Sequence, residues 1–173
     1  MDAATELGTL IGEQGRSLVY GGGSSGLMGR VSDAVIKAGG EVTGIIPTHL
    51  KQREIMHEHI TELIEVPDMH TRKLGMMERA DGFVVMPGGM GTLEEFFEIL
   101  TWKQLQLHDK PIVICNLDGY WDNLLETING IIDNRFAKAT DKDHFTVVDE
   151  VEKVIPALQA ARDPEREAAT SLM

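Results

Sequence analysis

A glycine-rich turn between an apolar run and an amphipathic run most restricts what this chain can fold into. The run 82–86 (GFVVM) is typical of a buried strand, and residues 87–95 (PGGMGTLEE) follow it. Glycines let an oxyanion approach the backbone closely, and the first N–H groups of a helix lack partners within the helix. A strand, a glycine turn and a helix N-terminus in this order predict a phosphate site. Glu94 and Glu95 add carboxylates suited to acid–base chemistry.

Short β-branched runs alternate with helical patterns along the chain, which favours an α/β fold with a doubly wound parallel sheet. We expect a single domain over residues 1–161. Residues 162–173 are polar and contain a proline, so we expect a disordered tail there. The patterns predict strands at 17–20, 42–46, 60–66, 82–86, 111–116 and 145–148, and helices at 2–14, 27–38, 69–80, 92–105, 120–134 and 149–161.

Charge and hydropathy exclude several classes of protein. The net charge is −12 and no cluster of Lys and Arg is present, so we expect no nucleic-acid partner. The longest apolar runs, such as residues 112–115, are far too short to cross a membrane. No charged-then-apolar leader begins the sequence, which favours the cytoplasm. Cys115 lies inside an apolar strand pattern and is predicted to be a buried hydrophobe.

A first glycine turn, residues 21–29 (GGGSSGLMG), fits the spacing of a dinucleotide-binding turn. The acidic residue that would hold a ribose hydroxyl should end the next strand, yet the strand expected at 42–46 ends in Pro47. A nicotinamide site is therefore disfavoured. The turn is predicted to line a crevice and to contact a phosphate or ribose through Gly22, Gly23 and Met28.

The second turn has a purely structural alternative. Thr92 and Glu95 match a capping box, in which Thr92 would be the N-cap and the Glu95 side chain would reach back to its amide. Three glycines before a cap exceed what capping requires, and a cap does not need Glu94. Both interpretations, cap and ligand site, stand at this point.

Arg72 and Lys73 lie near the start of the helix expected at 69–80 and supply cationic groups in an acidic chain. The planar fork of an arginine can bind a phosphate or a carboxylate. An Arg-Lys pair on a helix is also common on solvated surfaces. No spacing typical of a metal centre or of a Ser-His-Asp arrangement occurs, so we expect no metal and no acyl-transfer site.

Together these residues resemble the Lonely Guy (LOG) family of cytokinin riboside 5′-monophosphate phosphoribohydrolases, often labelled lysine decarboxylase-like. Residues 87–95 match its PGGxGTxxE motif and residues 69–73 its MHxRK motif. Residues 19–23, 27–29, 101–105 and 108–111 are also similar to the family. The decarboxylase label gains no support, because nothing here indicates a pyridoxal phosphate site.

The resemblance implies a Rossmann-like fold and hydrolysis of the N-glycosidic bond of a purine nucleoside 5′-monophosphate, without a cofactor. It also implies a homodimer or a higher homo-oligomer. The family usually begins with a strand and a Gly-Ser-Ser turn, which this chain lacks. By position, the catalytic residues would be Arg72 and Glu95, and the substrate-binding residues Glu54, Lys73, Gly88, Gly89, Met90, Gly91, Thr92, Leu93, Glu94 and Thr101. The alternative function is a non-catalytic nucleotide sensor or carrier on the same fold.

Overall fold

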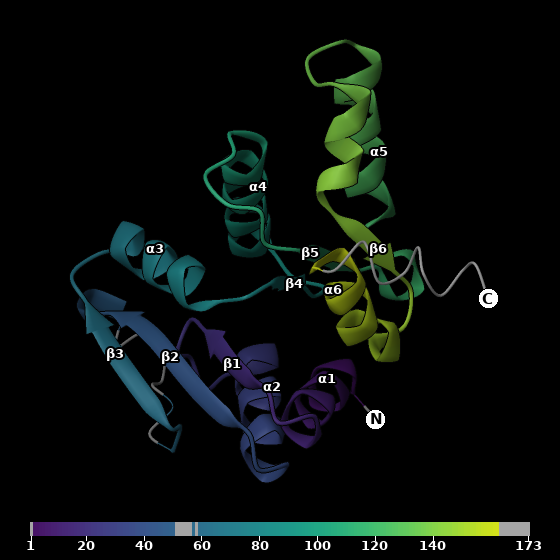
Figure 1. Ribbon diagram of the computed structural model, residues 1–173. Coiled ribbons are helices and arrows are strands. Elements are labelled where there is room, and N and C mark those ends of the chain that lie inside the picture. Colours follow the sequence, from purple (N-terminus) through teal and green to yellow (C-terminus); the bar gives the residue numbers. More distant parts are fainter. Residues whose placement is uncertain (1, 51–56, 58, 163–173) are drawn as a thin grey trace. The chain divides into compact units, whose positions relative to one another are not determined.

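The computed structural model describes residues 2–50, 57 and 59–162. The chain divides into two compact units, Met1–Ala80 and Asp81–Met173, and each has its own three-stranded parallel sheet (Figure 1). The first unit contains α1 (Ala3–Glu13), β1 (Ser17–Tyr20), α2 (Gly26–Lys37), β2 (Glu41–Pro47), β3 (Glu62–Val66) and α3 (Met69–Arg79). The second contains β4 (Phe83–Val85), α4 (Met90–Gln104), β5 (Ile112–Cys115), α5 (Asp122–Asp133), β6 (Thr146–Val148) and α6 (Val154–Arg162).

The sheet of the first unit has the order β1-β2-β3 and is covered on both faces. Val42 and Ile45 of β2 are both fully buried, and their positions along the strand direct their side chains to opposite faces. Val42 packs with Val35 of α2, whereas the side chain of Ile45 lies beside Gly75 of α3. The central strand of this sheet therefore buries apolar side chains on both faces, as expected for a parallel sheet covered on both sides.

The sheet of the second unit has the order β4-β5-β6, with β5 in the centre. Ile112 and Ile114 of β5 pack with Phe96 of α4 and with Trp121, Leu124 and Ile128. The alternate residues of β5, Val113 and Cys115, are fully buried on the other face. The core of this unit therefore fixes α4 against the sheet through Phe96.

The structure confirms the predicted α/β class with parallel strands. Every predicted helix and strand is present within two residues of its expected bounds, except that the helix predicted at 149–161 begins only at Val154, after the short 3-10 helix at Val151–Lys153. Short 3-10 helices at Thr48–Leu50 (η1), Leu117–Gly119 (η2), Ala139–His144 (η3) and Val151–Lys153 (η4) were not expected. A single domain over residues 1–161 stays a prediction. The tail predicted at 162–173 lies outside the described residues except for Arg162, the last residue of α6. Across the described ranges, no helix is both long and apolar enough to span a membrane.

Cys115 is predicted to resist alkylation in the folded protein. Its side chain is fully buried, and burial raises the pKa of its thiol to about 11, so almost no thiolate is present at pH 8. We expect iodoacetamide at pH 8 to label the protein only after denaturant is added, as measured by intact mass. Stoichiometric labelling without denaturant would contradict the burial of Cys115.

Candidate active site

The N-terminus of α3 positions the two predicted cations. The carboxylate of Asp68 accepts hydrogen bonds from the amide of Thr71 at 2.8 Å and from its hydroxyl at 3.0 Å. The hydrogen bond from the Thr71 amide is the main reason that the pKa of Asp68 lies below its usual value. Because this cap fixes the helix to begin at Met69, Arg72 and Lys73 follow directly after the first turn.

Arg72 and Lys73 are buried rather than solvated. Their exposed fractions are 6% and 8%, which excludes the surface interpretation of this pair. Charged side chains are seldom buried to this extent without a compensating contact. Their burial agrees with a site for an anionic ligand. In a chain with a net charge of −12, only a few cationic side chains can bind such a ligand.

The first glycine turn accommodates the Arg72 side chain. Its Nη2 donates to the carbonyl oxygen of Gly21 at 3.2 Å, and its Nη1 lies 3.7 Å from the sulfur of Met69. A Cβ on residue 21 would overlap the guanidinium group. Gly21 is therefore glycine because Arg72 occupies that space, and no dinucleotide is needed to explain it.

The other residues predicted in the first turn have packing roles in this structure. Gly22 and Gly23 are buried, and Gly22 has a φ of +78° that favours glycine. Met28 is half-buried against the cluster formed by Tyr20, Val35 and Val42. Contacts of Gly22, Gly23 and Met28 with a phosphate or ribose stay predictions.

The second glycine turn leads into α4 without a capping box. The helix begins at Met90, its N-cap is Gly89 and no side chain caps it. The first intrahelical bond in the turn runs from the Leu93 amide to the Gly89 oxygen at 3.2 Å. Thr92 is thus the third residue of the helix and not its N-cap, so the capping-box interpretation of Thr92 and Glu95 was wrong. The amides of residues 90–92 precede the helical ladder, as an anion site requires.

The glycines of this turn differ in what they do. A Cβ on Gly88 would overlap the side chain of Thr92, so Gly88 is required for packing. A Cβ on Gly89 or Gly91 would meet no protein atom within 4 Å, and neither residue has a positive φ. Neither protein packing nor backbone conformation explains why Gly89 and Gly91 are glycines. Close approach of a ligand to the backbone would explain both.

We predict that Gly91→Ala separates stability from ligand binding. Alanine favours a helix over glycine by up to about 1 kcal/mol, so the melting temperature should stay equal or rise. The added methyl group lies at the helix N-terminus, and we expect AMP to bind at least about 10-fold more weakly, about 1.4 kcal/mol. Calorimetry and thermal denaturation measure the two effects.

Gly130→Ala is the matched control for Gly91→Ala. Gly130 lies inside α5, and a Cβ there also meets no atom within 4 Å. It should gain the same stability and bind AMP unchanged. Wild-type affinity for AMP in Gly91→Ala would contradict the proposed phosphate site.

The remaining predicted residues of α4 lie in its first two turns, except for Thr101, which lies near its C-terminal end. Met90 is 85% exposed, Glu94 is exposed and Glu95 is half-buried. Leu93 packs partly against the core cluster around Phe96. Thr101 is exposed near the other end of the helix.

Each unit therefore carries one part of the predicted site. Arg72 and Lys73 adjoin the first glycine turn in the first unit, whereas residues 88–95 form the second glycine turn and the first turns of α4 in the second unit. Glu54 lies outside the described residues. Within the described ranges, no group of three or more His, Cys, Asp or Glu side chains could hold a metal ion.

Sequence reasoning missed two residues that contact the glycine turns, Tyr120 through its side chain and His57 through its backbone. The Tyr120 hydroxyl donates to the Gly88 oxygen at 2.7 Å. His57 donates its amide to the Gly22 oxygen at 3.2 Å, and its Nε2 lies 2.8 Å from Asp33 Oδ1. A signal existed for Tyr120. It follows β5 as Gly88 follows β4, and the carboxyl ends of paired parallel strands share one edge.

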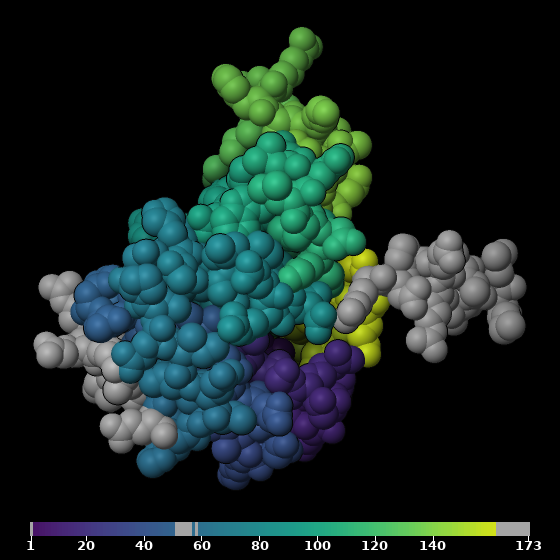
Figure 2. Space-filling view, turned by 60° about the vertical axis from the view of Figure 1, so that its left-hand side comes forward, coloured from purple at the N-terminus to yellow at the C-terminus, as the bar shows by residue number. Residues whose placement is uncertain are grey.

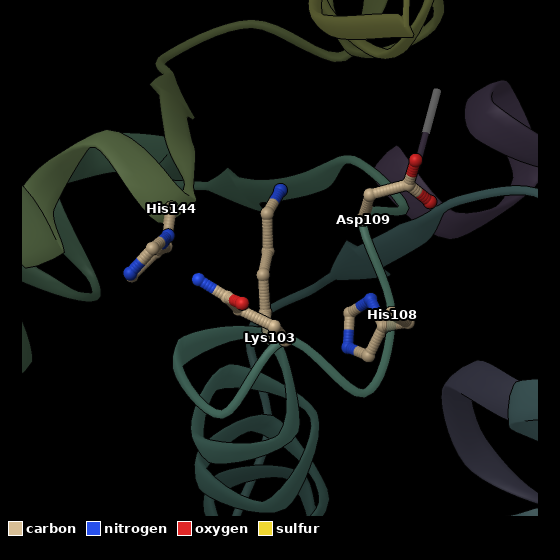
Figure 3. A pocket seen from close by; sticks show the side chains of 5 residues that line it. Lys103, His108, Asp109 and His144 are labelled. Atoms are coloured by element: carbon tan, nitrogen blue, oxygen red, sulfur yellow. The ribbon is translucent and has the colours of Figure 1, made fainter.

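A separate cavity of about 520 Å³ lies in the second unit (Figure 3). It is lined by Lys103, Gln106, His108, Asp109 and His144. Lys103 donates from Nζ to the Lys110 oxygen at 2.9 Å, and burial lowers its pKa. No predicted site residue lines this cavity, which lies at the C-terminal end of α4 rather than at its N-terminus.

Comparison with solved structures supports the fold. The molybdenum cofactor binding protein of Rippkaea orientalis has a TM-score of 0.67 at 22% identity, over 91% of this chain and 85% of that one. The molybdenum cofactor carrier protein of Chlamydomonas reinhardtii has a TM-score of 0.65 at 21% identity, over 92% and 85%. These similarities show a shared Rossmann-like fold.

Sequence comparison gives the family. A family model described as "Possible lysine decarboxylase" matches residues 28–158. The cytokinin riboside 5′-monophosphate phosphoribohydrolase LOG5 of Arabidopsis thaliana is 45% identical over 92% of this chain and 70% of its own length. LOG3 of the same plant, which carries the same enzyme name, is 41% identical over 99% and 80%. The chain therefore belongs to the LOG family, an enzyme family whose named members here are phosphoribohydrolases.

Proposed function

We propose that this protein hydrolyses the N-glycosidic bond of purine riboside 5′-monophosphates of the cytokinin type, releasing the free base and ribose 5-phosphate. The observation that carries the proposal is the uncapped N-terminus of α4, with Glu95 one turn inside it and space above Gly89 and Gly91. The names of the relatives at 41–45% identity supply the substrate class.

The 5′-phosphate is proposed to bind at the N-terminus of α4. The amides of residues 90–92 and the positive end of the helix dipole favour an anion there. Glycine at positions 89 and 91 lets phosphate oxygens reach the backbone. Holding this remote group converts binding energy into positioning of the glycosidic bond.

Glu95 is proposed to act on the ribose. Cleavage of the bond from C1′ to the base develops positive charge on the sugar, as in glycoside hydrolysis. A carboxylate can stabilise that charge or accept a proton from the attacking water. Since Glu95 takes no part in a cap, the structural alternative for this residue no longer competes with a chemical role.

Arg72 is proposed to be the second catalytic residue. The guanidinium group of its side chain contacts the Gly21 oxygen and the Met69 sulfur, so the orientation of its fork is set before a substrate binds. A fixed, buried guanidinium either orients the ribose phosphate or assists departure of the base. Lys73, the next residue in the sequence, is also buried and adds positive charge for the same anionic substrate.

Base release tests the proposal. The protein is incubated separately with isopentenyladenosine monophosphate and with AMP, and free base is measured by chromatography. We expect base from at least one of them. Absence of base from every purine monophosphate, with folded protein, would contradict the proposal. If the nucleotide stays unchanged but calorimetry shows that it binds, the result would instead support a carrier. A carrier is the main alternative because two proteins of this fold are named as a carrier protein and a binding protein of a cofactor.

We also propose a homodimer or higher homo-oligomer that works in the cytoplasm. The second unit exposes large apolar side chains: Leu105 is 63% exposed, Leu107 65% and Phe136 87%. The end of α5 and the light green segment after it project from the rest of this unit (Figure 2). Exposed apolar side chains of this kind favour cover by a second copy. Light scattering should give a mass of at least twice 19.1 kDa.

A further inference from the structure

Tyr120 joins the second glycine turn to the turn that follows β5. Its hydroxyl donates to the carbonyl oxygen of Gly88 at 2.7 Å, a contact between residues that are distant in sequence. The side chain is otherwise 54% exposed, and its ring meets Trp121 edge-on, with centroids 4.8 Å apart. An exposed tyrosine contributes little to the core, so the hydrogen bond is its main specific contact in the described structure.

The turn that carries Tyr120 is built to hold it. Asn116 accepts from the Trp121 amide through Oδ1 at 2.6 Å and donates from Nδ2 to Asp122 at 2.8 Å. Asp118 and Gly119 both have positive φ, +50° and +73°. A non-glycine residue in the left-handed region persists only where the surroundings enforce it. The two hydrogen bonds of Asn116 close the turn around Asp118 and Gly119, and they hold the backbone directly after Tyr120.

A bond to the Gly88 oxygen also determines where the next amide points. Gly88 and Gly89 share a planar trans peptide, in which the N–H of Gly89 is directed opposite to the oxygen of Gly88. Holding that oxygen toward Tyr120 therefore directs the Gly89 N–H away from Tyr120. A hydrogen bond accepted by the carbonyl also polarises the peptide and makes its N–H a stronger donor. Gly89 is the N-cap of α4, where the phosphate is proposed to bind.

We propose that Tyr120 is a positioning residue for the 5′-phosphate, which it serves by fixing the Gly88–Gly89 peptide so that the Gly89 amide donates to a phosphate oxygen. This inference rests on the proposed phosphate site at α4. The tyrosine acts through the peptide and does not touch the substrate. Its effect is therefore on ligands that carry the phosphate and not on the base.

Tyr120→Phe tests the inference, because it removes only the hydroxyl. We expect the Kd for AMP and the Kd for inorganic phosphate to rise about 3- to 10-fold, the range of one lost hydrogen bond. The KM for AMP should rise by the same factor while kcat changes less than about 2-fold. Because the ring stays and the hydroxyl is exposed, the melting temperature should fall by at most about 4 °C.

Adenosine, which lacks only the phosphate, is the matched control ligand. Its Kd should be the same for the wild-type protein and for Tyr120→Phe. Equal loss of adenosine and AMP binding, or a large fall in melting temperature, would assign Tyr120 a merely structural role and overturn the inference. Unchanged affinity of the variant for AMP and phosphate would overturn it as well.

The binding arm separates this inference from the proposed function. A wild-type protein that binds AMP but releases no base contradicts the hydrolase proposal, whereas the comparison of affinities still decides the role of Tyr120. A wild-type protein that binds neither AMP nor phosphate contradicts the inference about Tyr120, and release of base from isopentenyladenosine monophosphate still decides the hydrolase proposal.

Discussion

Glu95→Gln is expected to lower kcat for base release by about 10²- to 10⁴-fold, the contribution of a positioned general acid or base. The substitution keeps the size of the side chain and removes its charge. Since α4 has no side-chain cap, the change should cost little stability, with a melting temperature within about 3 °C of wild type. Binding of AMP should persist, because the substitution does not change the backbone amides that are proposed to bind the phosphate. Single-turnover kinetics and calorimetry measure the two effects.

Glu98→Gln is the control for Glu95→Gln. It removes one carboxylate from the same helix, a turn further from the N-terminus, and should leave kcat unchanged. Full activity in Glu95→Gln would remove Glu95 from the chemistry. Equal loss in both variants would indicate a general effect of helix charge instead of a specific role for Glu95.

Arg72→Lys is expected to lower kcat/KM by about 100-fold or more although it keeps the positive charge. The ammonium group of lysine is a single point of donation, whereas the guanidinium group of Arg72 donates to the Gly21 oxygen and, in the proposed mechanism, binds the anionic substrate through its planar fork. A lysine cannot make both contacts with one geometry. Steady-state kinetics with a purine monophosphate measure the loss.

Arg79→Lys is the matched control for Arg72→Lys. Arg79 also donates to a glycine carbonyl, that of Gly75 at 3.2 Å, but it is exposed at the end of α3. This variant should keep wild-type activity. Activity of Arg72→Lys at half the wild-type level or above would show that only charge matters at this position.

Periodicity was sufficient to predict the elements of the fold. β5 is a continuous apolar run and β2 buries apolar residues on both faces, as Val42 and Ile45 illustrate, because both faces of a central parallel strand are covered. The glycines that follow β1 and β4 located the two glycine turns. The fold class therefore followed from local patterns, and the comparisons with solved structures agree with it.

The start of α4 could not be predicted from the same patterns. Thr92 followed by Glu95 fits a capping box, and glycine is a poor helix former, so the sequence favoured a helix from Thr92. In the structure Met90 and Gly91 are helical. The Thr92 side chain packs against Gly88, and Phe96 packs in the core. These contacts stabilise the first turns of α4 and outweigh the low helix propensity of one glycine.

The burial of Arg72 and the role of Tyr120 depend on contacts distant in sequence. Arg72 reaches Gly21 and Tyr120 reaches Gly88, and no local pattern encodes either pair. Sequence reasoning identified Arg72 by its type and by family resemblance. It missed Tyr120 because the signal for this residue, its place after β5 as Gly88 follows β4, depends on which strands pair.

Hydrolysis of isopentenyladenosine monophosphate in water enriched in oxygen-18 shows which bond of the nucleotide is cleaved. The proposed hydrolysis of the N-glycosidic bond predicts free base and ribose 5-phosphate in equal amounts, with one labelled oxygen in the ribose 5-phosphate and none in the base. Mass spectrometry of the products measures this. Label in inorganic phosphate with release of a nucleoside, or no product from folded protein, would contradict it.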